Sequence, residues 1–410
     1  MLASAAPRRL LLALPQSLFD LGSGAAVSMR LMACQLASSG WQVQAVCTSA
    51  TESGRLGLPP VGSRWPSVSR RYLAPAEPGE PPRWQIRDSG VDFEVWALPE
   101  GTRQDWARLV GAAWERGVVR RLLALQPAVL FTFGADPSDH RIAAAARAAG
   151  RAVVLALHNL AYLGRSLPPH DALLLPSAHM AARHADVSPG CTGTLPPPMW
   201  DADTAVSTHE PVFFTFFNPE PAKGVELVIR LAALQPDWPF LVVAGRAGGA
   251  EFAATASRLG IDPSKLHNVT VSAGGVPVRE VLALARAVLV PSLVEEAAGR
   301  VAAEAIANGI PVIVSDSGAL PETVTPGGQV VPLRRTAGGV LQVDEAGVDR
   351  WLAALQTLAD EAGWRQASAR ARAASTRWQV AAQARATDTW FSQVAESVVA
   401  SAKRPSRGGG

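Results

Sequence analysis

The strongest constraint on the fold is an alternation of short apolar runs with segments of helical period, which occurs twice along the chain. A proline-rich stretch that begins at Leu195 separates the first series from a second one that starts at Val212. Alternating strands and helices predict parallel sheets covered by helices on both faces. We therefore expect an α/β protein with two doubly wound, Rossmann-like domains that face each other across a cleft.

The expected N-terminal elements are strands over 9–14, 42–47, 93–98, 129–133, 153–157 and 172–175, and helices over 26–38, 104–125 and 139–149. The expected C-terminal elements are strands over 212–217, 240–243, 269–271, 287–290, 311–315 and 329–331, and helices over 223–234, 249–258, 277–285, 298–308, 344–362, 364–374 and 377–400. Residues 54–88 show no clean period and predict a long irregular loop.

The domain boundaries follow from this pattern. We place an N-terminal acceptor domain at 1–205 and a C-terminal donor domain at 206–380. A helix over 381–400 is expected to pack back on the N-terminal domain, and residues 401–410, which end in three glycines, are expected to be disordered.

Composition limits the classes of protein that fit. The chain has 410 residues, of which 48% are hydrophobic and 18% charged, as in globular proteins with well-buried sheets. A net charge of +3, with arginines and acids interspersed, argues against a nucleic-acid partner. No apolar run is long enough to span a bilayer. Cys34, Cys47 and Cys191 are scattered and predict reduced packing residues in a cytoplasmic protein.

The first residues also resemble a secretory signal peptide, because arginines precede a short apolar run. That run is only about seven residues long, at the lower limit of such signals, and it leads into a glycine-rich loop. We favour a buried first strand, with a cleaved leader as the alternative.

The segment from Pro291 to Gly309 carries the clearest chemical signal. It runs from a strand end through a short loop into a helix, with Glu296 and Gly299 expected at the helix N-terminus. The free amides and the positive end of the dipole at such a terminus can hold a diphosphate.

Glu304 lies further into that helix, about 12 Å from Glu296 if the whole interval is helical. This distance is roughly the reach from a hexose ring across a diphosphate to a ribose. The neighbours of Glu304 are apolar, so its carboxylate needs hydrogen-bond donors, which two ribose hydroxyls would supply. The alternative is an ion pair with Arg300 one turn back, with Glu295 and Glu296 as ordinary first-turn acids. Spacing alone does not choose between the two.

A lysine follows another strand end, in Asn218-Pro-Glu-Pro-Ala-Lys223-Gly224. Only three of the 38 basic residues are lysines. Because lysine is so rare in this sequence, we favour a phosphate contact for Lys223 over the alternative of a solvated residue at a helix start.

Together these patterns resemble glycosyltransferase family 4. The resemblance rests on Asn-Pro-x-Pro-x-Lys-Gly, on Glu296 and Glu304 with seven residues between them, and on the following Ala-Asn-Gly-Ile-Pro-Val. It covers most of residues 210–325 and the N-terminal half more loosely. It implies the GT-B fold and transfer of a sugar from a nucleotide diphosphate donor with retention of anomeric configuration. It implies no metal and no cofactor beyond that co-substrate.

By position, the resemblance implies that Glu296 binds hydroxyls of the donor sugar, Glu304 the ribose and Lys223 the diphosphate. The remaining donor-binding residues that we expect in this half are Asn218, Arg246, Ala297, Ala298, Gly299 and Arg300. The family usually has Pro-Phe at 297–298 and an arginine at 218. Arg246, at the end of the next strand, is our suggested replacement for that cation.

In the N-terminal half, His158 follows a strand, and family members often place a histidine there that faces the donor sugar. The resemblance therefore groups His158 with Lys223 and Glu296 as catalytic residues, whereas the residues alone favour a histidine that caps a loop. Gly22, Ser23 and Gly24 resemble a loop beneath the donor phosphates, where backbone amides approach closely.

Two patterns are weaker. Asp201 and Asp203 match a metal-binding Asp-x-Asp, but they follow a triple proline, so we interpret them as solvated turn residues. His179 and His184 fall in a predicted helix without an acid or cysteine at ligand spacing, so we expect no metal there.

The expected acceptor is a carbohydrate, a lipid-linked molecule or a small molecule. The helix over 104–125 carries arginines with Trp106 and Trp114, which suits either docking on the inner face of a membrane or, as we favour, packing with snorkelling arginines. The Trp- and Arg-rich insert 64–88 is the better candidate for a surface on which sugar rings stack.

The resemblance implies front-face attack by an acceptor hydroxyl as the nucleoside diphosphate departs and takes the proton. A dinucleotide-dependent oxidoreductase is disfavoured, because Gly-Ser-Gly-Ala-Ala is not a full GxGxxG. A non-catalytic sugar-nucleotide-binding GT-B protein and a phosphorylase-like or epimerase GT-B enzyme are the alternatives. The sequence identifies neither the sugar, the base nor the acceptor.

Overall fold

The computed structural model describes residues 8–51, 69–75, 80–97, 103–187, 191–244, 249–272 and 276–402. They form two compact units. The N-terminal unit contains the described residues up to Pro176, from Ala181 to Pro198 and from Gln383 onward. The C-terminal unit contains Ser177–Met180 and those from Met199 to Ala382.

The N-terminal unit is built on a nine-stranded sheet in the order β3-β4-β5-β2-β1-β6-β7-β8-β9. Its strands are β1 (Arg9–Leu14), β2 (Gln42–Thr48), β3 (Ser69–Leu73), β4 (Arg83–Asp88), β5 (Val91–Trp96), β6 (Val129–Phe133), β7 (Ala152–Ala156), β8 (Ala172–Leu175) and β9 (Thr192–Thr194). Neighbouring strands are parallel except at the β3–β4 and β4–β5 pairs.

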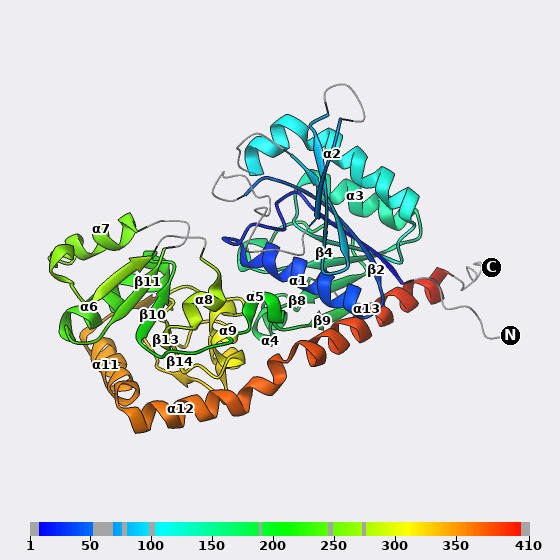
Figure 1. Cartoon of the computed structure of the whole chain (residues 1–410). Coiled ribbons are helices and arrows are strands. Elements are labelled where there is room, and N and C mark those ends of the chain that lie inside the picture. Colours follow the sequence, from blue (N-terminus) through cyan, green and yellow to red (C-terminus); the bar gives the residue numbers. More distant parts are fainter. Residues whose placement is uncertain are drawn as a thin grey trace. The chain divides into compact units, whose positions relative to one another are not determined.

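Helices cover both faces of this sheet (Figure 1). On one side lie α1 (Gly24–Ser38) and the C-terminal helix α13 (Val380–Ala402), and on the other lie α2 (Arg103–Leu125) and α3 (Pro137–Ala148). The expected first strand is confirmed, because β1 occupies the middle of the sheet and Leu10–Leu14 are fully buried. The pleat of β1 turns Leu11 and Ala13 into the same core as α2 and α3.

Polar contacts and aromatic packing hold α13 in the N-terminal unit from Gln383 onward. The Thr387 hydroxyl donates to Gln35 Oε1 on α1 at 3.0 Å, and the Trp41 indole donates to Asp388 Oδ1 at 2.7 Å. Phe391 is fully buried. Polar side chains that satisfy each other across two helices fix the register of the contact as well as its stability.

The C-terminal unit is built on a parallel six-stranded sheet in the order β12-β11-β10-β13-β14-β15. Its strands are β10 (Phe213–Phe217), β11 (Phe240–Val243), β12 (Val269–Ser272), β13 (Ala285–Val290), β14 (Val312–Val314) and β15 (Gln329–Val330), with a separate hairpin of β16 (Arg334–Arg335) and β17 (Leu341–Gln342). Its helices are α5 (Asp201–Thr204), α6 (Val225–Leu234), α7 (Ala250–Arg258), α8 (Val278–Leu282), α9 (Arg300–Ala307), α10 (Leu320–Val324), α11 (Glu345–Ala359) and α12 (Glu361–Ala374). Helix α4 (Ala178–Arg183) begins in this unit and ends in the other.

The structure corrects the expected irregular loop over 54–88. Its described part forms two antiparallel strands, β3 and β4, which extend the sheet edge. Their alternating pattern is hard to recognise in the sequence, because large polar or aromatic residues stand at consecutive positions, as at Arg70–Arg71 and Arg83–Trp84. Residues 52–68 and 76–79 lie outside the described residues.

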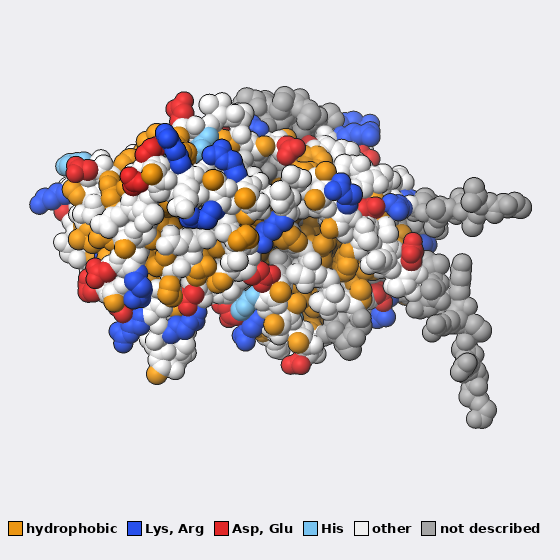
Figure 2. All heavy atoms as spheres, turned by 90° about the horizontal axis from the view of Figure 1, so that it is seen from below, with side chains coloured by type: hydrophobic (Ala, Val, Ile, Leu, Met, Phe, Trp, Pro, Cys, Tyr) orange, Lys and Arg blue, Asp and Glu red, His pale blue; other side chains and the backbone are white. Residues whose placement is uncertain are grey.

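At the other end of the chain, α13 continues to Ala402, two residues into the expected tail, and residues 403–410 lie outside the described part. Among the described residues, no helix is long and apolar enough to cross a bilayer. On the face drawn in Figure 2, basic and acidic side chains are interspersed among apolar surface and form no continuous basic patch.

Replacing Phe391 with alanine tests the anchoring of α13. Its ring meets Trp41, Phe131 and Trp390 edge-on, so Phe391→Ala should lower the free energy of unfolding of the N-terminal unit by about 3–5 kcal/mol. Urea unfolding measures this loss. Thr389→Ala, on an exposed face of the same helix, should change stability by less than about 0.5 kcal/mol. An equal, small effect of both substitutions would contradict the anchoring.

Candidate functional site

Two loops meet at the carboxyl ends of the neighbouring parallel strands β10 and β13. The Leu293 amide donates to Ala222 O at 2.9 Å and joins the loop after β13 to the loop after β10. Gly224 has a φ of +83°, and a Cβ there would lie 2.1 Å from Pro291 O. Glycine therefore permits both the turn and the close approach of the two backbones.

The ion pair at this junction joins two predicted site residues. Lys223 Nζ donates to Glu296 Oε1 at 2.7 Å, and the buried Ser292 hydroxyl lies 2.7 Å from the same oxygen. The side chains of Lys223 and Glu296 are 30% and 16% exposed. An ammonium group has three N–H donors, so the contact with Glu296 leaves Lys223 able to bind a further anion.

Asn218, at the position of the family's arginine, has a backbone role. Its φ of +59° lies in the left-handed region, which asparagine adopts more readily than most residues. Its amide donates to Val243 O at 3.0 Å, and its carbonyl accepts from the Glu220 amide at 2.6 Å. Its side chain is exposed. Arg246, the suggested replacement cation, lies outside the described residues.

We call Pro291–Gly299 the acidic loop. Its carbonyl oxygens are engaged by the protein: Ala319 N donates to Glu296 O at 2.8 Å, the Ser177 hydroxyl donates to Ala297 O at 2.6 Å, the Thr323 hydroxyl donates to Ala298 O, and Ala303 N donates to Gly299 O at 3.1 Å.

The amides of the same loop face the other way. In a trans peptide the C=O of one residue and the N–H of the next point in opposite directions. The N–H groups of Ala297, Ala298 and Gly299 therefore point away from those donors, and within the described part of the chain none of the three donates a hydrogen bond. Successive unengaged amides beside a cation suit an anion.

Helix α9 begins later than predicted. Gly299 has a φ of +68° and caps the helix, so the first helical residue is Arg300. Glu295 and Glu296 consequently lie in the acidic loop, and the interpretation of them as first-turn helix acids is wrong. The positive φ of Gly299 favours glycine at this turn, and a Cβ there would also lie 2.4 Å from the end of the Leu320 side chain.

Glu304 is 3% exposed and forms the ion pair that the sequence offered as an alternative, with Arg300 Nε 2.9 Å from Oε1. Burial raises the pKa of Glu304, Arg300 opposes the shift, and the Asp203 charge adds to it. Asp201 and Asp203 belong to helix α5, so they are not turn residues. The described residues contain no group of three or more His, Cys, Asp or Glu that could hold a metal ion.

The segment Ser177–Met180 contributes contacts that the sequence did not indicate. His179 Nε2 lies 2.6 Å from Glu295 Oε1, an acid 116 positions further along the chain that local spacing could not indicate. The amides of Ala178 and His179 donate to Glu322 at 2.7 and 3.0 Å. His184 is buried in the N-terminal unit.

In the N-terminal unit, His158 and the Gly22–Gly24 loop lie at the same edge of the sheet, because each follows the carboxyl end of a parallel strand. The ring of His158 packs against Phe133 with centroids 5.5 Å apart. Ser23 caps α1, with its hydroxyl 3.4 Å from the Ala26 amide. A Cβ on Gly24 would meet nothing within 4 Å. The amides of Gly22 and Ser23 already donate to Asp20, at 3.0 and 3.1 Å, so the structure leaves free space only beside Gly24.

The tryptophans of α2 are core residues. Trp106 and Trp114 are 1% and 0% exposed and pack edge-to-face, as the favoured packed-helix interpretation requires. In the described part of the insert, Tyr72 is 53% exposed and meets Trp84 edge-on at 5.4 Å, and the Arg70 guanidinium lies 4.5 Å from the Trp84 ring centre.

This geometry agrees with the match to a protein family. Residues 199–335 match the family described as glycosyl transferases group 1. The match covers 199–335, about a third of the chain. It spans β10, the two loops, α9 and the first strand of the β16–β17 hairpin. A search of curated protein sequences gave no match.

Solved structures show the fold of the whole chain. Sucrose-phosphate synthase from Thermosynechococcus elongatus matches with 18% identity and a TM-score of 0.64 over 96% of this chain and 100% of that chain. The catalytic domain of starch synthase IV from Arabidopsis thaliana, bound to ADP and acarbose, matches with 12% identity and a TM-score of 0.67 over 97% and 100%. HepE from Anabaena, in complex with UDP and glucose, matches with 15% identity and a TM-score of 0.64 over 94% and 99%. These similarities confirm the GT-B fold.

The environment of Glu304 predicts a pH dependence. Its pKa is raised above the ordinary 4.5, so its contribution to stability is full below that pH and is lost as pH rises through the folded pKa. Relative to Glu304→Gln, which cannot titrate, the wild type should lose free energy of unfolding as the pH rises above 4.5. Urea unfolding of both proteins across this range measures the difference. If the difference in free energy of unfolding between the two proteins stays constant, or if the wild type gains stability as the pH rises, the Arg300 charge outweighs burial in setting the pKa of Glu304.

Proposed function

We propose that the protein is a retaining glycosyltransferase that moves a sugar from a nucleotide diphosphate sugar to an acceptor hydroxyl without a metal ion. The observation that carries this proposal is the Lys223–Glu296 pair beside the unengaged amides of Ala297–Gly299. A cation and several amides suit a diphosphate, and a carboxylate beside them suits sugar hydroxyls. Membership of family 4 is part of the proposal.

The donor class is supported by the similar structures. HepE was solved with UDP and glucose and starch synthase IV with ADP, and both cover nearly the whole chain. A uridine or adenosine diphosphate sugar, with a hexose as the transferred group, is therefore the first donor to test.

The proposed reaction breaks the bond between the anomeric carbon and the leaving diphosphate oxygen. The acceptor oxygen forms its bond to that carbon on the same face, and its proton passes to the departing diphosphate. Lys223 and the amides of Ala297–Gly299 would stabilise the growing negative charge, and Glu296 would orient the sugar. This scheme requires no nucleophile from the protein.

Other predicted residues enter as proposals. We propose that Glu304 binds the ribose of the donor. Its carboxylate would then accept hydrogen bonds from ribose hydroxyls, either beside the Arg300 contact at 2.9 Å or in place of it. His158 and the Gly22–Gly24 loop of the N-terminal unit remain proposed donor-contacting residues. We also propose a cytoplasmic location, with the inner face of the membrane as the place to look for a lipid-linked acceptor.

Lys223→Ala and Glu296→Ala should each lower the rate of sugar transfer by roughly 10²–10³-fold, because each removes a group that acts on the transition state. The assay follows release of UDP or ADP from the nucleotide sugars, with water as the acceptor if none is known. Lys265→Ala removes an exposed lysine of the same unit and should leave the rate unchanged.

Unchanged turnover in both site variants would refute the assignment. A wild type that binds nucleotide sugars but releases no nucleoside diphosphate would favour the non-catalytic binding protein. This alternative rests on three departures from the family pattern, at Asn218, Ala297 and Ala298.

We further propose that the exposed Tyr72 ring and the half-buried Trp84 ring form the surface on which the acceptor stacks. Tyr72→Ala should raise the acceptor KM by about 3- to 10-fold and leave donor hydrolysis unchanged. The measurement is transfer from a radiolabelled donor to a panel of saccharides. Leu123→Ala, which removes a side chain that is 60% exposed on α2, is the matched control. Equal KM values for Tyr72→Ala and the control would contradict the proposal.

A further inference from the structure

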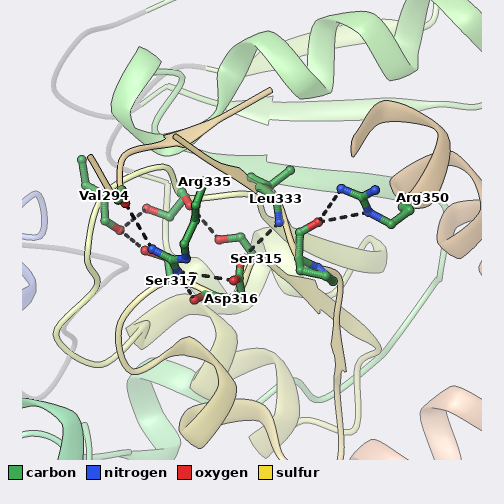
Figure 3. Close-up of polar contacts among 10 residues, drawn as sticks. Val294, Ser315, Asp316, Ser317, Leu333, Arg335 and Arg350 are labelled. Atoms are coloured by element: carbon green, nitrogen blue, oxygen red, sulfur yellow. Dashed lines mark hydrogen bonds and ion pairs between the residues drawn. The ribbon is translucent and has the colours of Figure 1, made fainter. Parts of the chain in front are cut away.

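The segment after β14 donates a hydrogen bond to every second carbonyl of the acidic loop. We call Ser315–Thr323 the brace. The pairs are Ser315 Oγ with Ser292 O at 2.7 Å, Ser317 Oγ with Val294 O at 2.5 Å, Ala319 N with Glu296 O at 2.8 Å, and Thr323 Oγ1 with Ala298 O. Figure 3 shows the first part of this arrangement, with Ser317 directed at Val294. Three of the four donors are side-chain hydroxyls.

The brace is itself fixed on its other side. The Asp316 carboxylate accepts from the Leu333 amide at 3.1 Å and from the Arg335 guanidinium at 3.3 Å, which also donates to Asp316 O at 2.9 Å (Figure 3). At Gly318, with a φ of +55°, a Cβ would lie 2.3 Å from Glu296 O. The brace therefore packs backbone to backbone against the acidic loop.

Two side-chain hydroxyls donate hydrogen bonds to the peptide groups whose N–H groups could bind an anion. Ser177 Oγ donates to Ala297 O at 2.6 Å, and Thr323 Oγ1 donates to Ala298 O. Because C=O and the following N–H oppose each other, these hydroxyls set the directions of the Ala298 and Gly299 N–H groups. Both hydroxyl-bearing residues are buried, at 2% and 4% exposed.

Because residues 297 and 298 are alanines, hydrogen bonds to their carbonyls are needed to fix the orientation of their peptide groups. A methyl side chain supplies little packing to hold a peptide in one orientation, and the loop has no helical hydrogen bonds before Gly299. Hydrogen bonds to the carbonyls can supply the missing restraint, because a flipped peptide would leave a buried hydroxyl unpaired.

We propose that the hydroxyls of Ser177 and Thr323 are positioning groups that aim the amides of Ala298 and Gly299 at the diphosphate of the donor. The inference rests on the proposed function. It adds two residues from segments outside the acidic loop, one of them in the short Ser177–Met180 segment. Neither side chain is required to touch the donor.

Thr323→Val tests the inference, because it keeps the shape of the side chain and removes the donor. It should weaken binding of UDP and ADP by about tenfold, the effect of one misaligned hydrogen bond to a charged group. Binding of uridine and adenosine, which lack phosphates, should be unchanged. Thr323→Ser restores the hydroxyl and should restore the affinity. Isothermal titration calorimetry of the full chain measures all four ligands.

The controls separate positioning from folding. Thr357→Val makes the same chemical change at an exposed site on α11 and should bind all ligands like the wild type. If Thr323→Val does not fold, Ser177→Ala is tested by the same titrations, with the same expected loss. Wild-type affinity for UDP and ADP in the folded variant would overturn the positioning role and leave the proposed function standing. A wild type that binds neither diphosphate would overturn both.

Discussion

The candidate site depends on the ion pair between Lys223 and Glu296, at 2.7 Å. These residues are 73 positions apart and meet because β10 and β13 are neighbouring parallel strands whose carboxyl ends lie at one edge of the sheet. A lysine and a glutamate in such proximity neutralise each other without a ligand. The same pair can present a cation to a phosphate and a carboxylate to a hydroxyl when a donor arrives.

The strands could be predicted because buried parallel strands are nearly continuous apolar runs, as in Leu10–Leu14 and Phe213–Phe217. Lys223 and Glu296 could be singled out because polar residues directly after such runs fall at the binding edge. Strands β3 and β4 were missed because they are the outermost pair of the sheet and carry arginines or a tryptophan at consecutive positions, as at Arg70–Arg71 and Arg83–Trp84. The start of α9 was missed because it depends on the backbone conformation of one glycine, Gly299.

Contacts between distant segments could not be predicted from local patterns. Nothing near Ser177 or Thr323 indicates that their hydroxyls reach Ala297 and Ala298. A usable signal does exist at one strand end, because Ser315 directly follows the buried strand β14 and its hydroxyl donates to Ser292 O in the acidic loop. For Glu304 the sequence left two interpretations open, an ion pair with Arg300 and a contact with the ribose. The structure contains the ion pair, and the ribose contact stays a prediction.

The most direct measurement of the central claim is a crystal structure of the full chain soaked with UDP. The account predicts that the terminal phosphate accepts hydrogen bonds from Lys223 Nζ and from at least one amide of Ala297–Gly299, with Glu296 beside it. A UDP molecule bound elsewhere, with Lys223 still engaged by Glu296 alone, would contradict the account.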